Sequence, residues 1–546
     1  MKKVISYILA AALCLALMGC SRADAAAGTK SGGSTPTMTA ESVTPSPTEE
    51  TGTVREETPD AQTTVTLSDG ATVVDGNGVT VRGDVITVTA EGAYRITGQL
   101  SNGQIAVDAL DAEVILVLDG VDVTCSGSAA ICVAEADKVT LFLTEGSENT
   151  LTSTGEFTDP EGKIDAAVFA RDDLTIRGNG ALTVSSDTGH GIVSKDDLKI
   201  KNGAVTVTAA KKGLSGNDSV EIEDGVITVS SGKDAIHAEN TEDADSGNVV
   251  ISGGKLDLTS GSDGVDASSD VTVEGGTITI RAADDGIHAD GTLTVSGGSL
   301  TVAESYEGLE ASAIEISGGT VDVTASDDGI NATSGSGSSG WGRGGDFAAQ
   351  SGVYIRVSGG TVSVNAGGDG VDSNGDLYVT GGALYVSGPT NSGNGAIDYN
   401  GTGSVTGGVV VAVGAAGMAE NFGASSTQGV ILYNLSSVQS GGTAIILTDS
   451  SGSVLAAFTP EKNYQSVVIS APGMTAGGTY TLRCGSLSET VTLSSTVWSN
   501  GGGMMGGMMG GRGGNQGFGT GDPGQGGQPG QGGGFGGQGG FPGGRR

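Results

Sequence analysis

Acidic side chains recur at a regular spacing in the middle of the chain, and binding of hard cations is the chemistry that they could perform. One phrase reads Ser262-Asp-Gly-Val-Asp266, Asp284-Asp-Gly-Ile-His288, Tyr306-Glu-Gly-Leu-Glu310 and Asp327-Asp-Gly-Ile-Asn331. Its glycines fall at positions 264, 286, 308 and 329, in steps of 22, 22 and 21 residues. From position 257 to 328 the chain carries fifteen Asp or Glu residues and a single basic residue, Arg281.

This spacing predicts columns of stacked carboxylates. If each phrase begins one coil of a repeat, corresponding residues lie one strand spacing apart, roughly 4.8 Å. Carboxylates at that distance repel one another, and each favours protonation or a nearby cation. Rigidly held oxygen donors suit Ca²⁺ far better than zinc or copper. The candidate calcium ligands are Asp263, Asp266, Asp284, Asp285, Glu307, Glu310, Asp327, Asp328, Asn331, Asp369 and Asp372. The alternative is a solvated acidic face on which Asp side chains only form turns at the coil corners.

A solenoid is the element that would position these side chains. Between the acidic phrases lies a second phrase, as in Gly275-Gly-Thr-Ile-Thr-Ile280 and Gly318-Gly-Thr-Val-Asp-Val323. Short alternating strands and glycine turns with a period in the twenties are typical of a solenoid. Apolar residues never recur at helical spacing. The fold class is therefore predicted as all-β, a right-handed parallel β-helix over residues 63–412. After it the period is lost, and residues 413–498 read as a small antiparallel β cap.

The two ends of the chain differ in composition from the repeats. Residues 1–20 have a basic start, a short apolar run and the sequence Leu17-Met-Gly-Cys20, which resembles a bacterial lipoprotein signal. This pattern predicts export, lipidation at Cys20 and an anchor on the outer side of the cell membrane. Residues 21–62, rich in Ser, Thr, Pro and Glu, are expected to form a disordered stalk. Residues 499–546 form a Gly/Met/Gln-rich tail, also expected to be disordered.

The net charge of the 546-residue chain is −37 and its pI is about 4.1. Such a surface repels phosphate backbones and attracts cations, which excludes a nucleic-acid partner. We expect the protein to act as a monomer.

Several motifs in order resemble a known family. They are Gly92-Ala-Tyr-Arg-Ile-Thr-Gly98, Gln104-Ile-Ala-Val-Asp108, the repeated Asp-Gly-Ile phrases and Gly478-Thr-Tyr-Thr-Leu482. Together they are similar to the calcium-binding, polysaccharide-binding β-helix family of bacterial surface proteins, whose fold resembles that of the family 9 pectate lyases. The resemblance implies Ca²⁺ as cofactor and a pectic or cellulosic polysaccharide as partner. A long Ser/Gly insertion after Asn331 departs from the even pattern.

Binding and catalysis remain alternatives at this stage. In the related lyases a lysine is the base, and here no lysine occurs between Lys255 and Lys462. If the protein were a calcium-dependent pectate lyase, the base would be Lys212 or Lys233. We favour a structural role in which these lysines pair with nearby carboxylates. His237 and His288 are expected to face solvent. A third class, a structural surface spacer or adhesin, fits the same chain.

Overall fold

A computed structural model describes residues 56–159, 162–240, 242–243, 245–334 and 348–501. They all lie in one compact unit, Arg55–Arg546. The signal segment with Cys20, the stalk up to residue 55 and the tail from residue 502 lie outside the described residues. Strands, turns and loops make up the described part, which contains no helix, as predicted. In these ranges there is accordingly no helix of the length and apolarity needed to cross a membrane.

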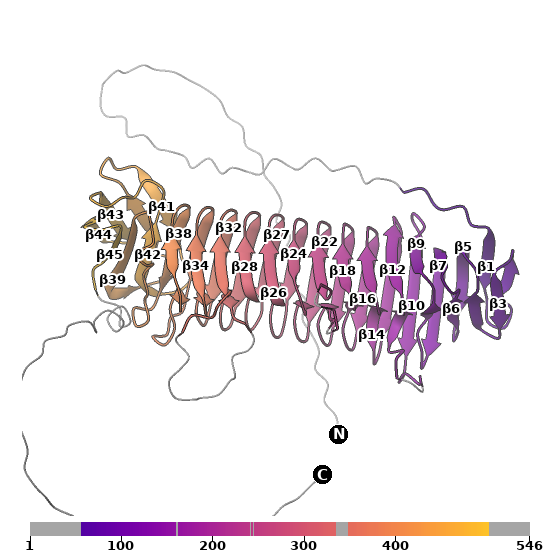
Figure 1. Ribbon diagram of the computed structural model, residues 1–546. Helices are drawn as coiled ribbons and strands as arrows, with labels where there is room; N and C mark the ends of the chain where they lie inside the picture. The colour runs from indigo at the N-terminus through magenta and orange to yellow at the C-terminus, as the bar shows by residue number, and fades with distance from the viewer. Residues whose placement is uncertain (1–55, 160–161, 241, 244, 335–347, 502–546) are drawn as a thin grey trace, which may run out of the picture. The chain divides into compact units, whose positions relative to one another are not determined.

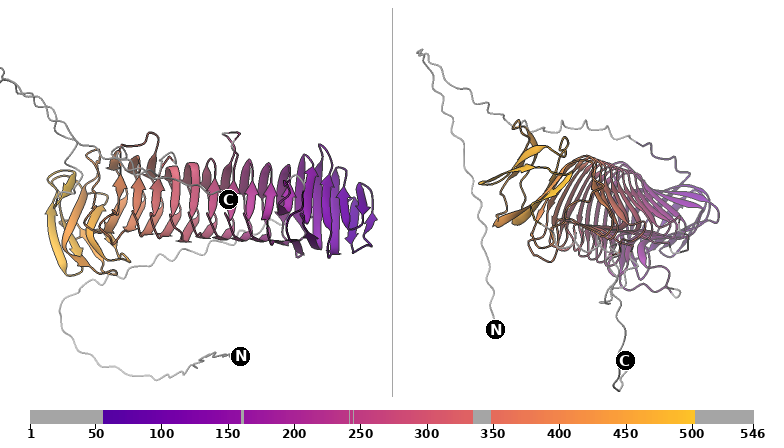
Figure 2. Two further views of the ribbon diagram at one scale, coloured as in Figure 1. Left: turned by 90° about the horizontal axis from the view of Figure 1, so that it is seen from below. Right: turned by 60° about the vertical axis from the view of Figure 1, so that its left-hand side comes forward.

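Each coil of the solenoid contributes one strand to each of three faces. One coil consists of β14 (His190–Ser194), β15 (Asp197–Ile200) and β16 (Ala204–Ala209). The chain then returns to the first face as β17 (Leu214–Gly216), which pairs in parallel with β14. The same three-strand step repeats along the stack, so that successive coils lie side by side (Figures 1 and 2). The predicted parallel β-helix is confirmed.

The three faces contain the following strands in addition to those four. The first face is formed by β6 (Gln104–Asp108), β8 (Ile131–Glu135), β11 (Ala166–Ala170), β20 (Ile236–Ala238), β23 (Val265–Ala267), the first parts of β26 (Ile287–Val295) and β28 (Leu309–Ile316), β30 (Ile330–Ala332), β33 (Val371–Ser373) and β36 (Asp398–Tyr399). The second face is formed by β9 (Lys138–Leu143), β12 (Asp173–Gly178), β18 (Ser219–Ile222), β21 (Asn248–Ile251), β24 (Val271–Val273), the second parts of β26 and β28, β31 (Tyr354–Val357), β34 (Asp376–Val379) and β37 (Gly403–Val405). The third face is formed by β10 (Glu148–Thr154), β13 (Ala181–Ser186), β19 (Val226–Ser231), β22 (Lys255–Ser260), β25 (Thr277–Arg281), β27 (Ser299–Glu304), β29 (Thr320–Ala325), β32 (Thr361–Ala366), β35 (Ala383–Ser387) and β38 (Val409–Gly414).

The N-terminal end of the solenoid departs from this pattern. Strands β1 (Thr63–Leu67) and β2 (Val73–Asp75) pair antiparallel, as do β3 (Val79–Arg82) and β4 (Val85–Val88). The long strands β5 (Gly92–Leu100) and β7 (Glu113–Ser126) each reach around a corner from one face to the next. At the end of a purely parallel stack, backbone N–H and C=O groups of the first coil would lack hydrogen-bond partners. The antiparallel pairs supply such partners.

Alternation of apolar and polar residues builds the core. In β16, Val205, Val207 and Ala209 point inward and are buried, while the residues between them are exposed. One buried apolar cluster runs without interruption from Val65 in β1 to Val468 in the cap. Burial of a Val, Leu or Ile side chain contributes about 1.5–3 kcal/mol, so this interior stabilises the whole stack.

Glycine is required at two corners of the coil for different reasons. Gly276 has a φ of +84°, in the left-handed region that residues with a Cβ rarely adopt. At Gly286 the obstacle is the next coil, because an added Cβ would lie 2.5 Å from the carbonyl oxygen of Gly308. The two repeated phrases therefore keep the coils close together.

A cap of mainly antiparallel strands covers the last coil, as the sequence predicts. It consists of β39 (Val430–Gln439), β40 (Ile445–Thr448), β41 (Val454–Phe458), β42 (Tyr464–Ser470), β43 (Thr479–Cys484), β44 (Leu487–Thr492) and β45 (Val497–Ser499). Strand β42 pairs antiparallel with β38 and so takes up the edge of the third face. Strands β41, β40, β43 and β44 form a separate four-stranded sheet, which shares an apolar cluster with the facing side chains of β38, β39 and β42.

Candidate functional site

The first face brings the predicted calcium ligands into two adjacent columns. In the strands, Glu310 pairs with Asn331, and Asn331 pairs with Asp372. At the preceding corner, backbone N–H groups of Gly264, Gly286, Gly308 and Gly329 donate to the carbonyl oxygens of Asp285, Glu307, Asp328 and Asp369 in the next coil. The columns expected from the steps of 22, 22 and 21 residues are therefore confirmed. We call the following set the acidic ladder: Asp263, Asp284, Asp285, Glu307, Glu310, Asp327, Asp328, Asn331, Asp369 and Asp372.

Carboxylates of the acidic ladder converge in three groups. Within each group, one oxygen per residue lies within 4.8 Å of the others. The groups are Asp263 with Asp284 and Asp285, then Asp285 with Glu307 and Glu310, and finally Asp328 with Asp369 and Asp372. Asp285 belongs to two of them. Asp327 is not a member of any of these groups, although it lies beside Asp328 in the chain.

Some of these oxygens also have a structural role. Asp263 Oδ1 accepts a hydrogen bond of 2.9 Å from the backbone N–H of Asp285, and Asp328 Oδ1 accepts one of 2.6 Å from Asp369. Each carboxylate thus ties its corner to the next coil, as the turn-forming alternative expects. The second oxygen of Asp263 accepts only a long hydrogen bond of 3.5 Å, from the hydroxyl group of Ser262.

Proton binding is favoured at several carboxylates of the acidic ladder. Burial raises the pKa of Asp328 to about 6, of Asp369 to about 7 and of Asp372 to about 8, and neighbouring carboxylates add to the effect. Burial likewise raises the pKa of Asp263 to about 6. The pKa of Asp285 is also raised, first by burial and then by Glu310. Negative charge is therefore destabilised here unless a proton or a metal cation is bound.

Asn331 presents an unused acceptor within the acidic ladder. Its Nδ2 donates a hydrogen bond of 2.8 Å to Glu307 Oε2, and only 9% of the residue is exposed. Its Oδ1 is buried and has no hydrogen-bond partner within the described ranges. In register, Asn331 lies between Glu310 of one coil and Asp372 of the next.

Asp266 differs from the other predicted ligands. Its two oxygens lie 2.7 Å from His237 Nδ1 and 2.9 Å from His288 Nδ1. Burial alone would raise the pKa of Asp266, but hydrogen bonds from the two histidines lower it overall. The hydrogen bond to Asp266 raises the pKa of His288 to about 9. Only 7% of His237 is exposed, so the expectation that His237 faces solvent is wrong.

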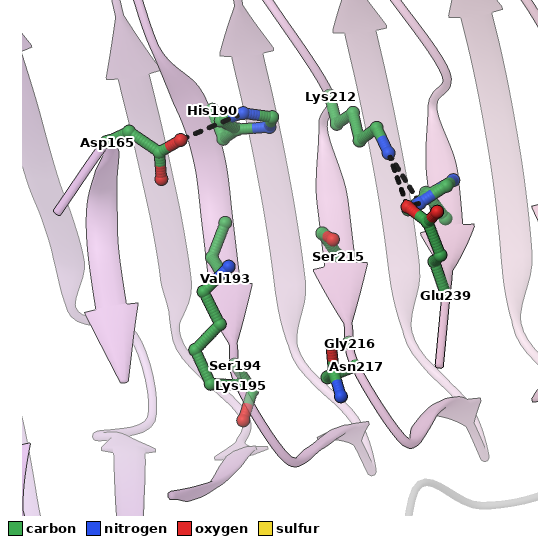
Figure 3. A pocket seen from close by; sticks show the side chains of 11 residues that line it. Asp165, His190, Val193, Ser194, Lys195, Lys212, Ser215, Gly216, Asn217 and Glu239 are labelled. Atoms are coloured by element: carbon green, nitrogen blue, oxygen red, sulfur yellow. Dashed lines mark hydrogen bonds and ion pairs between the residues drawn. The ribbon is translucent and has the colours of Figure 1, made fainter. Parts of the chain in front are cut away.

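Beside the acidic ladder, the first face forms a pocket that the sequence did not indicate (Figure 3). Its volume is about 110 Å³, and it spans the coils of β11, β14, β17 and β20. We call it the lysine pocket. Its lining residues are Asp165, His190, Val193, Ser194, Lys195, Lys212, Ser215, Gly216, Asn217, His237 and Glu239.

Lys212, one of the two predicted candidates for a catalytic base, lies in the lysine pocket. Its Nζ contacts His237 Nε2 and lies 3.8 Å from Asp234 and 3.9 Å from Glu239. Burial lowers the pKa of Lys212, and the two carboxylates oppose this shift. Lys233, the other candidate, is exposed and is not part of the pocket wall.

A further acidic group lies outside the repeated phrases. Oxygens of Asp173, Asp196 and Asp197 lie within 4.8 Å of one another, at the corner between the first and second faces. Burial and the neighbouring Asp218 raise the pKa of Asp196. The sequence analysis missed this group because its coils lack the Asp-Gly-Ile phrase.

Comparison with known proteins gives three similarities. Residues 82–329 match the sequence model of a family described as "Carbohydrate-binding domain-containing protein". A protein of that description from Acetivibrio thermocellus is 43% identical over 140 residues, which cover 25% of this chain and 48% of the relative. The chain thus spans about half the length of the curated relative that it matches. A structure described as the polysaccharide lyase-like protein from C. thermocellum, gadolinium derivative, is 33% identical, with a TM-score of 0.42, and the match covers 43% of this chain and 96% of that chain. Over residues 82–329, which include the lysine pocket and much of the acidic ladder, the chain is therefore similar to the carbohydrate-binding domain-containing protein family.

Proposed function

We propose that this protein binds an acidic or cellulosic polysaccharide through Ca²⁺ held on the acidic ladder. The family match over residues 82–329 and the description of the Acetivibrio thermocellus relative support a carbohydrate as the partner. Support for calcium comes from this chain's own residues. The proposal concerns binding, with the β-helix as a rigid frame.

One observation carries the proposal: carboxylates of the acidic ladder lie close together, and in the described part of the chain none of them is paired with a basic side chain. In the described part of the chain, no Lys, Arg or His forms an ion pair with a carboxylate of the acidic ladder; the ion pairs nearby involve Asp257, Asp266 and Asp290. Three groups of oxygen donors therefore lie close together, the pKa values of Asp263, Asp328, Asp369 and Asp372 among them are raised, and none of the donors forms an ion pair with a basic side chain in the described part of the chain. Ca²⁺ takes six to eight oxygen ligands in flexible geometry, which such groups can supply in part.

The residues fit the ion best at two places. Asp328, Asp369 and Asp372 would hold one calcium, and Asn331, whose Oδ1 has no hydrogen-bond partner in the described ranges, is the strand neighbour of Asp372. A second would lie at the groups that share Asp285. Ca²⁺ bound there would offer open positions to a carboxylate or hydroxyl of a sugar. We leave Asp266 out of the proposed calcium sites, because its oxygens are used by His237 and His288.

The test is co-sedimentation of the purified protein with polygalacturonate and with cellulose, in calcium and in EGTA. We expect binding in calcium that becomes much weaker in EGTA, because without a bridging cation a chain of net charge −37 largely repels a polyanion. Asp285→Asn should weaken binding in calcium, whereas Asp257→Asn, an exposed acid on the third face, should not. Binding of equal strength in calcium and in EGTA would refute the calcium bridge, and absence of binding to both polymers would favour a structural spacer.

Location on the cell surface is a separate part of the proposal. The sequence Leu17-Met-Gly-Cys20 motivates export and a lipid anchor at Cys20. A fatty-acid probe supplied to the cells should label the wild type and leave Cys20→Ala unlabelled. Equal labelling of both proteins would remove the anchor from the proposal.

The burial of Lys212 favours a second candidate function, a polysaccharide lyase. A base must be unprotonated to act, and burial lowers the pKa of Lys212. In this reaction Lys212 Nζ would take the proton from the sugar carbon next to the carboxylate. The bond to the leaving sugar oxygen would then break and leave an unsaturated end. Binding remains the main proposal, since Asp234 and Glu239 favour the protonated form of the same lysine.

A further inference from the structure

Two lysines, Lys195 and Lys212, line the lysine pocket together with two carboxylates, Asp165 and Glu239. The chain contains 26 Lys and Arg residues against 63 Asp and Glu residues, yet Lys195 and Lys212 both line this small cavity. A second cavity of about 500 Å³ shares Asp165 and Lys195 with it and adds Phe169 and Arg171. Positive charge is therefore concentrated at one place on the first face.

Lys195 is free to bind a ligand. Among the described residues it takes part in no ion pair, whereas Lys212 is held near Asp234 and Glu239. In Figure 3 the two lysines reach the pocket from neighbouring coils. An exposed ammonium group beside a cavity, with no carboxylate of the protein in contact, suits a negatively charged group of a ligand.

Neutral polar groups lie between the two lysines, and each carboxylate of the wall has a basic partner: Asp165 lies 3.3 Å from His190, and Glu239 lies 3.2 Å from His237. Ser215 and Asn217 supply a hydroxyl and an amide from β17 and the residue that follows it. His190 Nε2 lies 3.3 Å from Asp165 Oδ2, while its Nδ1 is buried and has no hydrogen-bond partner in the described part of the chain. Cations, hydroxyls and amides together match a ligand that carries both a carboxylate and hydroxyl groups.

Size and position narrow the ligand further. The lysine pocket, with a volume of about 110 Å³, is the smaller of the two cavities and has room for a carboxylate. The adjoining cavity of about 500 Å³ is large enough for a sugar ring. On the other side, β20 at the pocket pairs with β23, so the acidic ladder begins one coil further on.

We propose that the lysine pocket binds the carboxylate of a uronate unit, with Lys195 as its charge partner, in a polysaccharide that continues along the first face to the acidic ladder. This inference rests on the proposed function, because it assumes the same polysaccharide. It adds a site that recognises the carboxylate directly, without calcium. The first face would then hold one acidic chain in two ways, by protein cations at the pocket and by metal cations on the ladder.

The experiment measures calorimetric binding of a short oligogalacturonate to the full-length protein in EGTA, where only the pocket can act. The variants are Lys195→Gln and, as a matched control, Lys255→Gln, which removes an exposed lysine from the third face. Both lysines are exposed, and equal melting temperatures would show that both variants are folded. We expect Lys195→Gln to lose about 10-fold in affinity and Lys255→Gln to bind as the wild type does.

Two further arms separate this inference from the proposed function. The methyl ester of the same oligomer, which lacks the negative charge, should bind wild type and Lys195→Gln equally weakly. Equal affinity of Lys195→Gln and Lys255→Gln for the acid, or no binding by the wild type in EGTA, would overturn the pocket. Long polygalacturonate in calcium reports on the acidic ladder, so loss of calcium dependence there would refute the proposed function while leaving the measurement in EGTA intact.

Discussion

The lysine pocket and the acidic ladder lie on the same face, but partly buried carboxylates have different neighbours in the two regions. Around the pocket each acid has a basic partner: Asp165 lies by His190, Asp234 by Lys212, and Asp266 between His237 and His288. On the acidic ladder, carboxylates face other carboxylates. One end of the face has cations of its own, and the other end is built so that a cation from solution stabilises it.

The change between the two regions can be followed at one outward-facing strand position of the first face, from each coil to the next. In register, the residues at this position are Cys132, Phe169, Val193, Ser215, His237, Asp266, His288, Glu310, Asn331 and Asp372. Cys132, Phe169 and Val193 belong to a small apolar cluster outside the main core. Along this position the side chains are first apolar, then a serine, then two histidines with Asp266 between them, and finally two acids with Asn331 between them. A rigid stack can carry such a gradient because each coil fixes the position of the next.

Removal of calcium should have the largest effect, and only on the acidic ladder. A ligand bound to the folded state alone stabilises it by about 2.7 kcal/mol per site at 100 times its dissociation constant. We expect the melting temperature to fall by several degrees when calcium is removed by a chelating resin, and to recover when calcium is restored. Hydrogen exchange should locate the loss of protection at β26, β28 and β33, with β14 and β17 unchanged. An identical melting curve with and without calcium would contradict a structural role for the ion.

Asp266→Asn should have the next largest effect, because it breaks the paired end of the face. Buried His237 would lose the nearest of its three carboxylate partners and keep Asp234 and Glu239, at a cost of about 1–3 kcal/mol in the free energy of unfolding. The pKa of His288 should fall from about 9 toward the ordinary value of about 6.5. Urea denaturation and an NMR titration of the histidines measure the two changes. The control is Asp257→Asn, whose exposed pair with Arg281 is expected to contribute at most about 1 kcal/mol.

The sequence predicted the ladder better than the pocket, for a physical reason. Steps of 22, 22 and 21 residues between Gly264, Gly286, Gly308 and Gly329 fix the register, because each added coil repeats the same backbone path. The contact between His237 and Asp266 depends on side-chain rotamers, and a loop insertion after β20 lengthens the step between their coils. His190 and Lys195 come from one coil and Lys212 from the next, and neither coil carries the acidic phrase. No sequence motif indicates that these side chains line one pocket.

The free energy of unfolding should also depend on pH differently in the two regions. On the ladder, folding raises the pKa of Asp369 to about 7 and of Asp372 to about 8, so the folded state binds protons more tightly than the unfolded state. This stabilisation is complete below the unfolded value of about 3.9 and is lost as the pH rises through 7 and 8. Calcium-free protein should therefore unfold more readily at pH 8.5 than at pH 6, as followed by urea denaturation.

Calcium supplies the control for this pH experiment. When the ion replaces the proton as counter-charge, the loss of stability between pH 6 and pH 8.5 should become smaller. Asp266 works in the opposite direction, because histidine contacts lower its pKa and its stabilisation is lost only in acid. A calcium-free protein that gains stability over the same rise in pH would show that the carboxylates of the ladder are not held close together.

The smallest effect is expected in cleavage of polygalacturonate. Lys212 is buried enough to lower its pKa, but Asp234 and Glu239 lie 3.8 Å and 3.9 Å from its Nζ and favour the charged form, which cannot take a proton. Polymer incubated with calcium and the protein should therefore gain no ultraviolet absorbance from unsaturated ends. The matched variants are Lys212→Ala in the pocket and Lys233→Ala on the exposed corner. Sustained release that Lys212→Ala abolishes and Lys233→Ala preserves would make the lysine pocket an active site, and the difference between the two regions would then be one between catalysis and binding.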